Sequence, residues 1–282
     1  MAGELVFITG ATGFIGFAVL HQALESGYRV RISIRKEPQI QTLSSHPLIA
    51  PFVTQGKVSF AIVPDITVAG AFDEVLKDVV YVEHLAAALP GPVSLLPFLF
   101  ILSEKAPGGS HANKGIKTDN PEQDIVQPAI HGTTSILTSA LLHASIKRIV
   151  ITSSIAAILS STAQSASTPT TYTSTSRVSP LPTGPWPNGI EAYRGAKALA
   201  LDATDRFVAE KKPRFSIVNV MPGYVIGRNA LAMSARELQS GSNNVVLGLV
   251  TGNVRKEAQL ATVVDVRDVA RVQVEALDGR KV

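Results

Sequence analysis

Short apolar runs rich in β-branched residues recur along the chain, and stretches with helical periodicity lie between them. Such runs are typical of strands buried on both faces of a parallel sheet. The predicted strands cover residues 5–8, 30–34, 58–63, 79–82, 148–151 and 215–220. Helices are predicted over residues 14–26, 125–144 and 192–210, and Gly27 is the expected C-cap of the first. This alternation predicts an α/β fold whose parallel sheet is covered by helices on both faces.

Two segments interrupt the alternation. Residues 160–190 are rich first in Ser and Thr and then in Pro and Gly. This composition fits either a surface connection or a flap over a substrate site. Residues 88–120 contain four prolines and a Gly-Gly pair, and their role is left open.

The composition is that of a globular chain. Of its 282 residues, 45% are hydrophobic and 17% are charged, which allows a sizeable core. The net charge of +4 is spread over scattered residues, so no nucleic-acid partner is expected. The chain has no cysteine, which excludes disulfides and thiolate zinc sites, and no metal site is expected.

The N-terminus leads directly into the first predicted strand without the pattern of a signal peptide, which predicts a cytoplasmic protein. The most apolar segment, residues 93–102, contains Pro97 and is shorter than the roughly 20 residues of a membrane span. No membrane partner is therefore expected. A monomer or a homodimer is expected, since long helices such as 192–210 can pair in four-helix interfaces.

A glycine-rich turn joins the first predicted strand to the first predicted helix. Residues 9–16 read TGATGFIG, which spaces the glycines as G-x-x-G-x-x-G. Glycines alone are weak evidence, because many turns need positive φ. Between a strand and a helix, however, they let a pyrophosphate approach the helix N-terminus, which predicts a Rossmann-type dinucleotide site. The candidate residues are Thr9, Gly10, Thr12, Gly13, Phe14 and Ile15.

The second predicted strand is followed by Arg35 and Lys36. A site specific for NAD normally has Asp or Glu near this point, to bind the ribose 2′-hydroxyl. A guanidinium instead pairs with a 2′-phosphate, so NADP(H) is the predicted cofactor. The alternative is that both residues are solvated charges at a strand end.

Tyr193 and Lys197 lie four residues apart on the predicted helix 192–210 and therefore on one face of it. A cation beside a phenol lowers its pKa, which would bring Tyr193 closer to neutrality. Ser153 and Ser154 follow the strand 148–151, at the sheet edge where ligands bind. Ser154 is predicted to donate a hydrogen bond to the reacting carbonyl oxygen. Ser153 is interpreted as a helix cap or a turn residue. The predicted catalytic residues are Ser154, Tyr193 and Lys197.

These motifs together resemble the extended short-chain dehydrogenase/reductase family, which belongs to the NAD-dependent epimerase/dehydratase superfamily. The resemblance runs from Phe7 almost to the C-terminus and is greatest to the dihydroflavonol reductase, cinnamoyl-CoA reductase and fungal carbonyl (methylglyoxal) reductase group. The matching segments are residues 9–16, 65–66, 84–87, 128–133, 147–154, 193–197, 222–227 and 264–270.

The resemblance implies further cofactor contacts. Asp65 and Ile66 would flank the adenine, Leu85, Ala86 and Ala87 would line the cofactor, and Pro222, Gly223 and Val225 would pack at the nicotinamide end. Thr152, Tyr193 and Lys197 belong to the same predicted set. From the residues alone, Asp65 is equally a turn residue after Pro64, and His84 is more simply a packed core histidine.

The resemblance also implies a division of the chain. Residues 1–222 would form the NADP(H)-binding domain with the catalytic residues, and residues 223–282 a small, apparently truncated substrate lobe. Relatives typically continue for several tens of residues beyond the position of Val282.

The predicted function is NADPH-dependent reduction of an aldehyde or ketone, or the reverse alcohol oxidation, by a Ser-Tyr-Lys mechanism on a small-molecule substrate. One alternative is an NAD(P)-dependent sugar-nucleotide epimerase or dehydratase. Such enzymes tend to carry Asn where this chain has Ala129, which favours the reductase by analogy. The other alternative is a catalytically weak NADP(H)-binding sensor or interaction protein.

Overall fold

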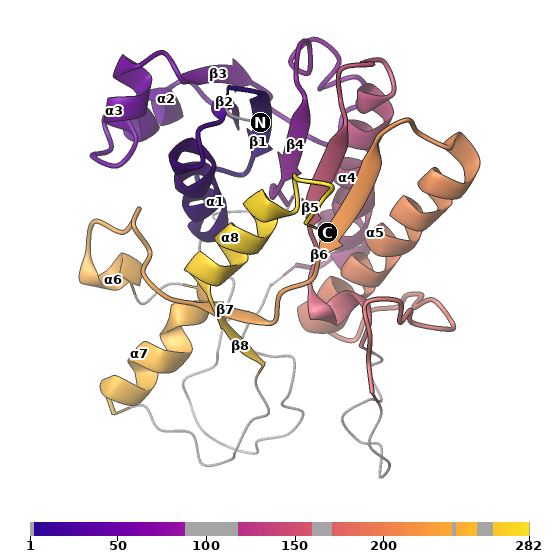
Figure 1. The fold of residues 1–282 in the computed structure, drawn as a ribbon. Coiled ribbons are helices and arrows are strands. Elements are labelled where there is room, and N and C mark those ends of the chain that lie inside the picture. The colour runs from indigo at the N-terminus through magenta and orange to yellow at the C-terminus, as the bar shows by residue number, and fades with distance from the viewer. Residues whose placement is uncertain (1–2, 88–117, 160–170, 239–240, 253–261, 282) are drawn as a thin grey trace.

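The computed structural model describes residues 3–87, 118–159, 171–238, 241–252 and 262–281. Six parallel strands form its main sheet in the order β3-β2-β1-β4-β5-β6 (Figure 1). The strand order reverses between β1 and β4, as in a doubly wound sheet, which confirms the predicted fold class. The strands are β1 (Leu5–Thr9), β2 (Arg29–Ile34), β3 (Val58–Ile62), β4 (Tyr81–His84), β5 (Arg148–Thr152) and β6 (Ser216–Val220).

Every predicted strand is present, but β4 begins later than expected. Val79 donates its N–H to Leu76 O at 3.2 Å and so closes a turn, whereas the ladders with β1 and β5 begin at Tyr81. The shift places His84 at the strand end, directly beside Thr9 of β1.

The three predicted helices are also present. The first is α1 (Phe14–Glu25), and Gly27, with φ 88°, lies just beyond its end. The second begins as a π-helical turn, Glu122–Val126, and continues as α4 (Gln127–Ala140), so it ends earlier than predicted. The third is α5 (Gly189–Lys211), which Asn188 caps by accepting the N–H groups of Ile190 and Glu191.

Several short elements were not anticipated. They are α2 (Pro38–Ser44), α3 (Ala50–Thr54), α6 (Ala235–Leu238), α7 (Asn244–Val250), α8 (Val266–Glu275), the 3₁₀ turns Ile155–Ala157 and Gly241–Asn243, and the strands β7 (Tyr224–Ile226) and β8 (Val263–Asp265). β7 and β8 pair in parallel as a second, two-stranded sheet. Most of these elements have seven residues or fewer and carry little periodic signal of their own. α8 is longer and amphipathic, with Val266, Val269, Ala270, Gln273 and Val274 on its buried face, and it was missed in the sequence.

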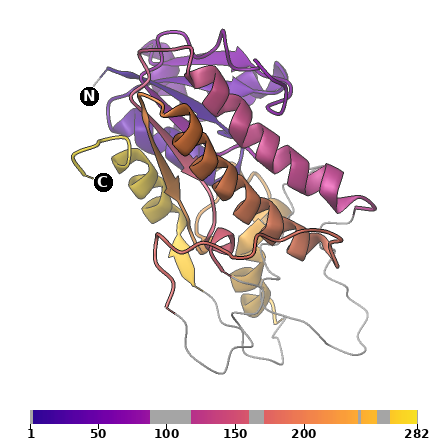
Figure 2. The same cartoon turned by 90° about the vertical axis from the view of Figure 1, so that its right-hand side faces the viewer.

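Helices cover both faces of the main sheet. α1 and α8 lie side by side on one face, where Phe17, Leu20 and Val274 join the strand residues in one apolar core (Figure 1). α4 and α5 cover the other face, over Phe7 and Ile149 (Figure 2). The carboxyl ends of the strands are thus left open between the two helical layers.

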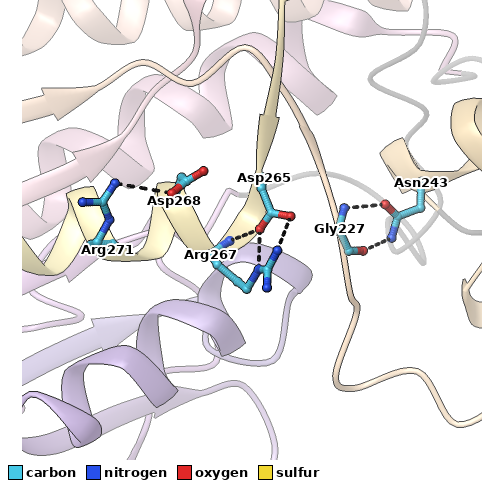
Figure 3. Close-up of polar contacts among 6 residues, drawn as sticks. All are labelled: Gly227, Asn243, Asp265, Arg267, Asp268 and Arg271. Carbon is cyan, nitrogen blue, oxygen red and sulfur yellow. Dashed lines mark hydrogen bonds and ion pairs between the residues drawn. The ribbon is translucent and has the colours of Figure 1, made fainter.

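α8 connects the C-terminal segment to the main sheet. Asp265 caps it by accepting the N–H and the side chain of Arg267, and Asn243 pairs with both backbone groups of Gly227 (Figure 3). Since α8 packs on α1, part of segment 223–282 completes the dinucleotide-binding core rather than standing apart from it. The predicted division at residue 222 stays a prediction.

Most of the two irregular segments lies outside the described residues, namely 88–117 and 160–170. Residues 171–188 run without helix or strand into α5. Within the part of the chain that is described, no helix is long and apolar enough to cross a bilayer.

Candidate active site

The glycine turn packs closely against the neighbouring strand and its own helix. Gly10 has φ +77°, and a Cβ there would lie 2.7 Å from Ala86 N. A Cβ on Gly16 would lie 2.0 Å from Gly10 O. Both contacts are with backbone atoms that cannot move aside, so these two positions require glycine whether or not a ligand binds.

The N-terminus of α1 opens beside this turn. Gly13 is its N-cap and offers no side chain to the first N–H groups, and the first turn has no acidic residue. Thr12 and Gly13 are exposed, and Phe14 and Ile15 are half-buried. Uncapped N–H groups at the positive end of a helix dipole favour an anion. The predicted phosphate-binding residues are therefore brought together at an anion-compatible helix end.

Thr9 and His84 join the ends of β1 and β4 beneath the turn. Thr9 Oγ1 accepts the N–H groups of Leu85 and Ala86, each at 3.1 Å, and lies 3.0 Å from His84 Nδ1. Because it already accepts two protons, the Thr9 hydroxyl donates to Nδ1, which leaves His84 neutral with its proton on Nε2. Burial, with a contribution from Lys197, lowers the pKa of His84 to about 4. The predicted core histidine is confirmed.

His84 makes the folded state sensitive to acid. The unfolded chain protonates this histidine below pH 6.5, whereas the folded chain does so only near pH 4. The stability it contributes is therefore complete above pH 6.5 and is lost as the pH falls towards 4, with a total of about 3 kcal/mol. In urea denaturation at a series of pH values, His84→Gln should lose less unfolding free energy over this interval than wild type. Parallel curves would contradict the assignment.

Arg35 and Lys36 lie exposed at the end of β2. The Arg35 guanidinium donates to Ala87 O at 3.5 Å, which places it across the mouth of the glycine turn. Gln39 Oε1 accepts both of their backbone N–H groups and fixes the start of the following loop. Both cations are thus available to an anionic group on this side of the sheet.

Asp65 is observed as a turn residue. Its Oδ1 accepts from the N–H and the hydroxyl of Thr67, at 2.8 and 2.7 Å. These bonds, helped by the charge of Arg35, hold the pKa of Asp65 below its usual value. Ile66 is buried against Gly132 of α4. The contact of this pair with an adenine stays a prediction.

The three predicted catalytic residues come together at the carboxyl end of β5. Ser154 is fully buried, and its side chain hydrogen-bonds the Tyr193 hydroxyl. It also accepts Ala156 N–H at 3.1 Å, so it caps the following 3₁₀ turn, a role expected for Ser153. Lys197 Nζ donates to Thr152 O at 3.4 Å and lies 5.9 Å from the centroid of the Tyr193 ring.

Burial determines the pKa shifts of Tyr193 and Lys197 in the chain without cofactor, and the expected lowering of the Tyr193 pKa by Lys197 together with the nicotinamide charge stays a prediction. Burial raises the pKa of Tyr193 above its ordinary value, and the hydrogen bond with Ser154 lowers it by less. Burial also lowers the pKa of Lys197, to about 8. Withdrawal from water disfavours the charged form of both groups.

A pocket lies beside Lys197, between the strand ends and helices α4 and α5. Its lining includes many of the predicted residues: Ile66, Ala86, Ala87, Thr152 and Lys197. Sequence reasoning did not select Thr204 and Asn219, which line it as well. Arg35, Ser154 and Tyr193 are not part of the lining.

Residues 222–225 close the other side of this region. Pro222 O accepts the N–H of Ile155 at 3.1 Å. A Cβ on Gly223 would lie 2.3 Å from Thr262 O, and Val225 packs against Phe14 at the start of α1. This segment therefore joins the turn after β5 to the phosphate-binding end of α1.

Comparison with known proteins places this arrangement in a family. The model of the NAD-dependent epimerase/dehydratase family matches residues 6–95. An NAD-dependent epimerase/dehydratase of Alternaria alternata is 36% identical over 98% of this chain and 73% of its own length. The chain belongs to the NAD-dependent epimerase/dehydratase family.

Family members with other names are also similar. A ketoreductase of Cercospora nicotianae is 28% identical over 99% of this chain and 73% of its own length. The crystal structure of Gre2 from Candida albicans in complex with NADPH superposes with a TM-score of 0.74 at 25% identity, covering 98% of this chain and 75% of that one. The chain thus spans about three quarters of the length of these family members.

Trp186 packs on α5 and was missed in the sequence. Its indole N–H donates to Glu122 Oε2 at 2.7 Å, and Glu122 Oε1 accepts from Gln127 at 2.6 Å. Its ring lies against Gly195, between Tyr193 and Lys197 in the sequence. The signal in the sequence was that Trp186 is the only tryptophan of the chain.

Gly195→Ala should displace this ring. The new Cβ would lie 2.3 Å from Cη2 and Cζ3 of Trp186, so the indole must leave its bond to Glu122. We expect red-shifted tryptophan emission and a loss of about 1–3 kcal/mol in unfolding free energy. Gly184→Ala is the matched control, because its Cβ would lie 3.4 Å from Trp186 Nε1, an ordinary contact. Equal emission spectra for both variants would contradict the prediction.

Proposed function

We propose that the protein is an NADPH-dependent reductase of a small aldehyde or ketone, which also catalyses the reverse alcohol oxidation. The observation that carries the proposal is the arrangement of Ser154, Tyr193 and Lys197 at the carboxyl end of β5, beside a pocket that Lys197 lines. The names of relatives agree with it, since they include ketoreductases and a putative NADPH-dependent methylglyoxal reductase.

The residues of the chain fit the cofactor. The positions of Gly10 and Gly16 keep the backbone close to the uncapped end of α1, which suits a pyrophosphate. Arg35, exposed beside Ala87 and next to Lys36, suits a 2′-phosphate. The remaining proposed contacts are Thr9, Thr12, Gly13, Phe14, Ile15, Asp65, Ile66, Leu85, Ala86, Thr152, Tyr193, Lys197, Pro222, Gly223 and Val225.

Bound NADPH supplies the hydride that the carbonyl carbon receives. Tyr193 donates its hydroxyl proton to the carbonyl oxygen, and its raised pKa keeps that proton in place until a base of sufficient strength develops. Ser154 donates a hydrogen bond to the same oxygen once it exchanges its contact with Tyr193 for the substrate. Lys197, which donates a hydrogen bond to Thr152 O, would hold the nicotinamide ribose, and its charge would stabilise the phenolate left on Tyr193.

A spectrophotometric screen tests this proposal. NADPH oxidation is followed over aldehydes, diketones and β-ketoesters, with NADH in parallel. We expect net consumption of NADPH with at least one carbonyl class and a preference for NADPH over NADH. Turnover of a sugar nucleotide without net consumption would indicate an epimerase, since an epimerase regenerates its cofactor. Tight NADPH binding without turnover across the screen would indicate a sensor or interaction protein.

We also propose a cytoplasmic protein that is a monomer or a homodimer, with a dinucleotide-binding domain over residues 1–222 and a substrate lobe over residues 223–282. The domain division rests on the family resemblance. Light scattering after size-exclusion chromatography measures the mass of the assembly, and a mass above that of two chains would exclude the expected states.

A further inference from the structure

Glu83 is a carboxylic acid buried in the middle of the main sheet. Its side chain is 0% exposed, and within the described part of the chain neither carboxyl oxygen has a hydrogen-bond partner. Its neighbours in the ladder are Ile8 on β1 and Val150 on β5. Both pack on the face that α1 and α8 cover, so Glu83 is enclosed there as well. None of the proposed catalytic steps uses this group.

The enclosure favours the neutral form of Glu83. Burial raises its pKa well above the usual glutamate value. No ion pair to it occurs among the described residues. Tyr28 and Tyr81, which belong to the same core as its neighbours Ile8 and Val150, have raised pKa values and are neutral phenols. A neutral carboxylic acid carries one O–H donor and therefore needs an acceptor close by.

Gln273 of α8 has a side-chain oxygen that can accept a hydrogen bond from Glu83. It is 0% exposed, its Nε2 donates to Thr152 Oγ1, and within the described residues its Oε1 has no partner. Thr152 and Val150 point to the same face of β5, and Val150 is paired with Glu83. The amide of Gln273 therefore lies above the strand next to Glu83, on the same side of the sheet.

We propose that the Glu83 carboxylic acid donates its hydrogen bond to Gln273 Oε1, and that Glu83 and Gln273 are positioning residues for Lys197. The contact completes a chain from Glu83 through Gln273 to Thr152, whose carbonyl accepts from Lys197 at 3.4 Å. Thr152 is then fixed from both faces of the sheet. The Thr152 hydroxyl binds Gln273 of α8, and the Thr152 carbonyl binds Lys197 of α5. The role of Lys197 in this inference rests on the proposed function, whereas the contact itself does not.

This series of hydrogen bonds affects the carboxyl end of β5, where the proposed catalytic residues lie. Ser153 and Ser154 follow Thr152 directly, and Ser153 N–H continues the ladder to Val220 O at 2.8 Å. If the hydrogen bond from Gln273 to Thr152 is lost, the Thr152 carbonyl that accepts from Lys197 becomes more mobile. The backbone at Ser154 becomes more mobile as well. Loss of the contact should therefore lower the rate of the chemical step more than the affinity for NADPH.

Two measurements test the contact without any enzyme assay. Infrared difference spectra of wild type against Glu83→Gln should show the carbonyl band of a protonated acid, and a carboxylate band would overturn the proposal. In a double-mutant cycle of Glu83→Met and Gln273→Leu, the changes in the folding equilibrium constant should be non-additive by about threefold or more. Additive effects would overturn it equally.

A third measurement tests the positioning of Lys197, again without turnover. Acetylation of Lys197 by acetic anhydride, followed by peptide mass spectrometry, should be faster in Gln273→Leu and Glu83→Met than in wild type. Glu83→Gln should keep the wild-type rate, because a glutamine N–H also donates to Gln273 Oε1. Val274→Ala is the matched control, because it removes buried methyl groups from the same helix face and leaves the hydrogen bonds of Glu83, Gln273 and Thr152 intact. Equal rates in Gln273→Leu and Val274→Ala would overturn the positioning role.

With a substrate from the screen, the same variants separate positioning from general destabilisation. Gln273→Leu and Glu83→Met should lower kcat by about 3- to 10-fold with little change in KM for NADPH, and Glu83→Gln should restore kcat. Val274→Ala should lower the unfolding temperature without a comparable loss of kcat. A Glu83→Gln variant as slow as Glu83→Met would overturn the inference. Absence of turnover in wild type would count against the proposed function alone, because the first three measurements would still decide the contact.

Discussion

Tyr193→Phe is expected to lower kcat for carbonyl reduction by about 10²–10⁴-fold, the range by which a positioned general acid accelerates proton transfer. Phenylalanine keeps the ring beside Lys197 but removes the hydroxyl that Ser154 contacts. Since only this proton donor is lost, the dissociation constant for NADPH should change little. Steady-state kinetics and a fluorescence titration with NADPH measure the two quantities.

Tyr28→Phe is the matched control for this variant. Tyr28 is buried, whereas Tyr193 is half-buried, and burial raises the pKa of both hydroxyls, that of Tyr28 to about 12. Tyr28 lies on the opposite face of the sheet, against Tyr81. Its kcat should stay within about twofold of wild type. An active Tyr193→Phe enzyme, or an equal loss in both variants, would remove Tyr193 from the catalytic step.

Arg35→Asp is expected to reverse the preference for the cofactor. A guanidinium paired with a phosphate contributes about 1.5–3 kcal/mol, so its removal should lower kcat/KM for NADPH by about 10- to 150-fold. The new carboxylate repels the 2′-phosphate and offers an acceptor to the 2′-hydroxyl of NADH, as in NAD-specific sites. We therefore expect kcat/KM for NADH to stay the same or rise.

Lys36→Ala is the comparison for this second variant. Its side chain is exposed beside Arg35, but the hydrogen bond to Ala87 O across the glycine turn comes from Arg35. We expect a smaller loss with NADPH and no gain with NADH. If Arg35→Asp lowered kcat/KM for both cofactors by the same factor, Arg35 would have a structural role instead of selecting the 2′-phosphate.

The sequence predicted the parts of this fold that are determined locally. Continuous β-branched runs mark strands buried on both faces, and the glycine turn is recognisable because close backbone contacts at Gly10 and Gly16 exclude any Cβ. The spacing of Tyr193 and Lys197 needed only the geometry of a helix.

What the sequence could not predict depends on contacts between distant segments. The three-residue strands β7 and β8 are too short for a periodic signal. Three contacts join residues that only the folded chain brings together. They are the packing of α8 on α1, the hydrogen bond from Gln273 to Thr152 and the packing of the Trp186 ring against Gly195. The raised pKa of Tyr193 in the chain without cofactor has the same origin, because burial of this residue arises from tertiary packing.

The packing of α8 on α1 also bears on how the protein is made. α1 leaves the ribosome well before α8, the helix that covers its apolar side with Ala270 and Val274. Until then Phe17 and Leu20 have only part of their final cover, and such exposed apolar surface attracts chaperones or other nascent chains. Contacts between such distant segments also slow folding. The nascent chain should therefore depend on protection from aggregation until α8 has emerged.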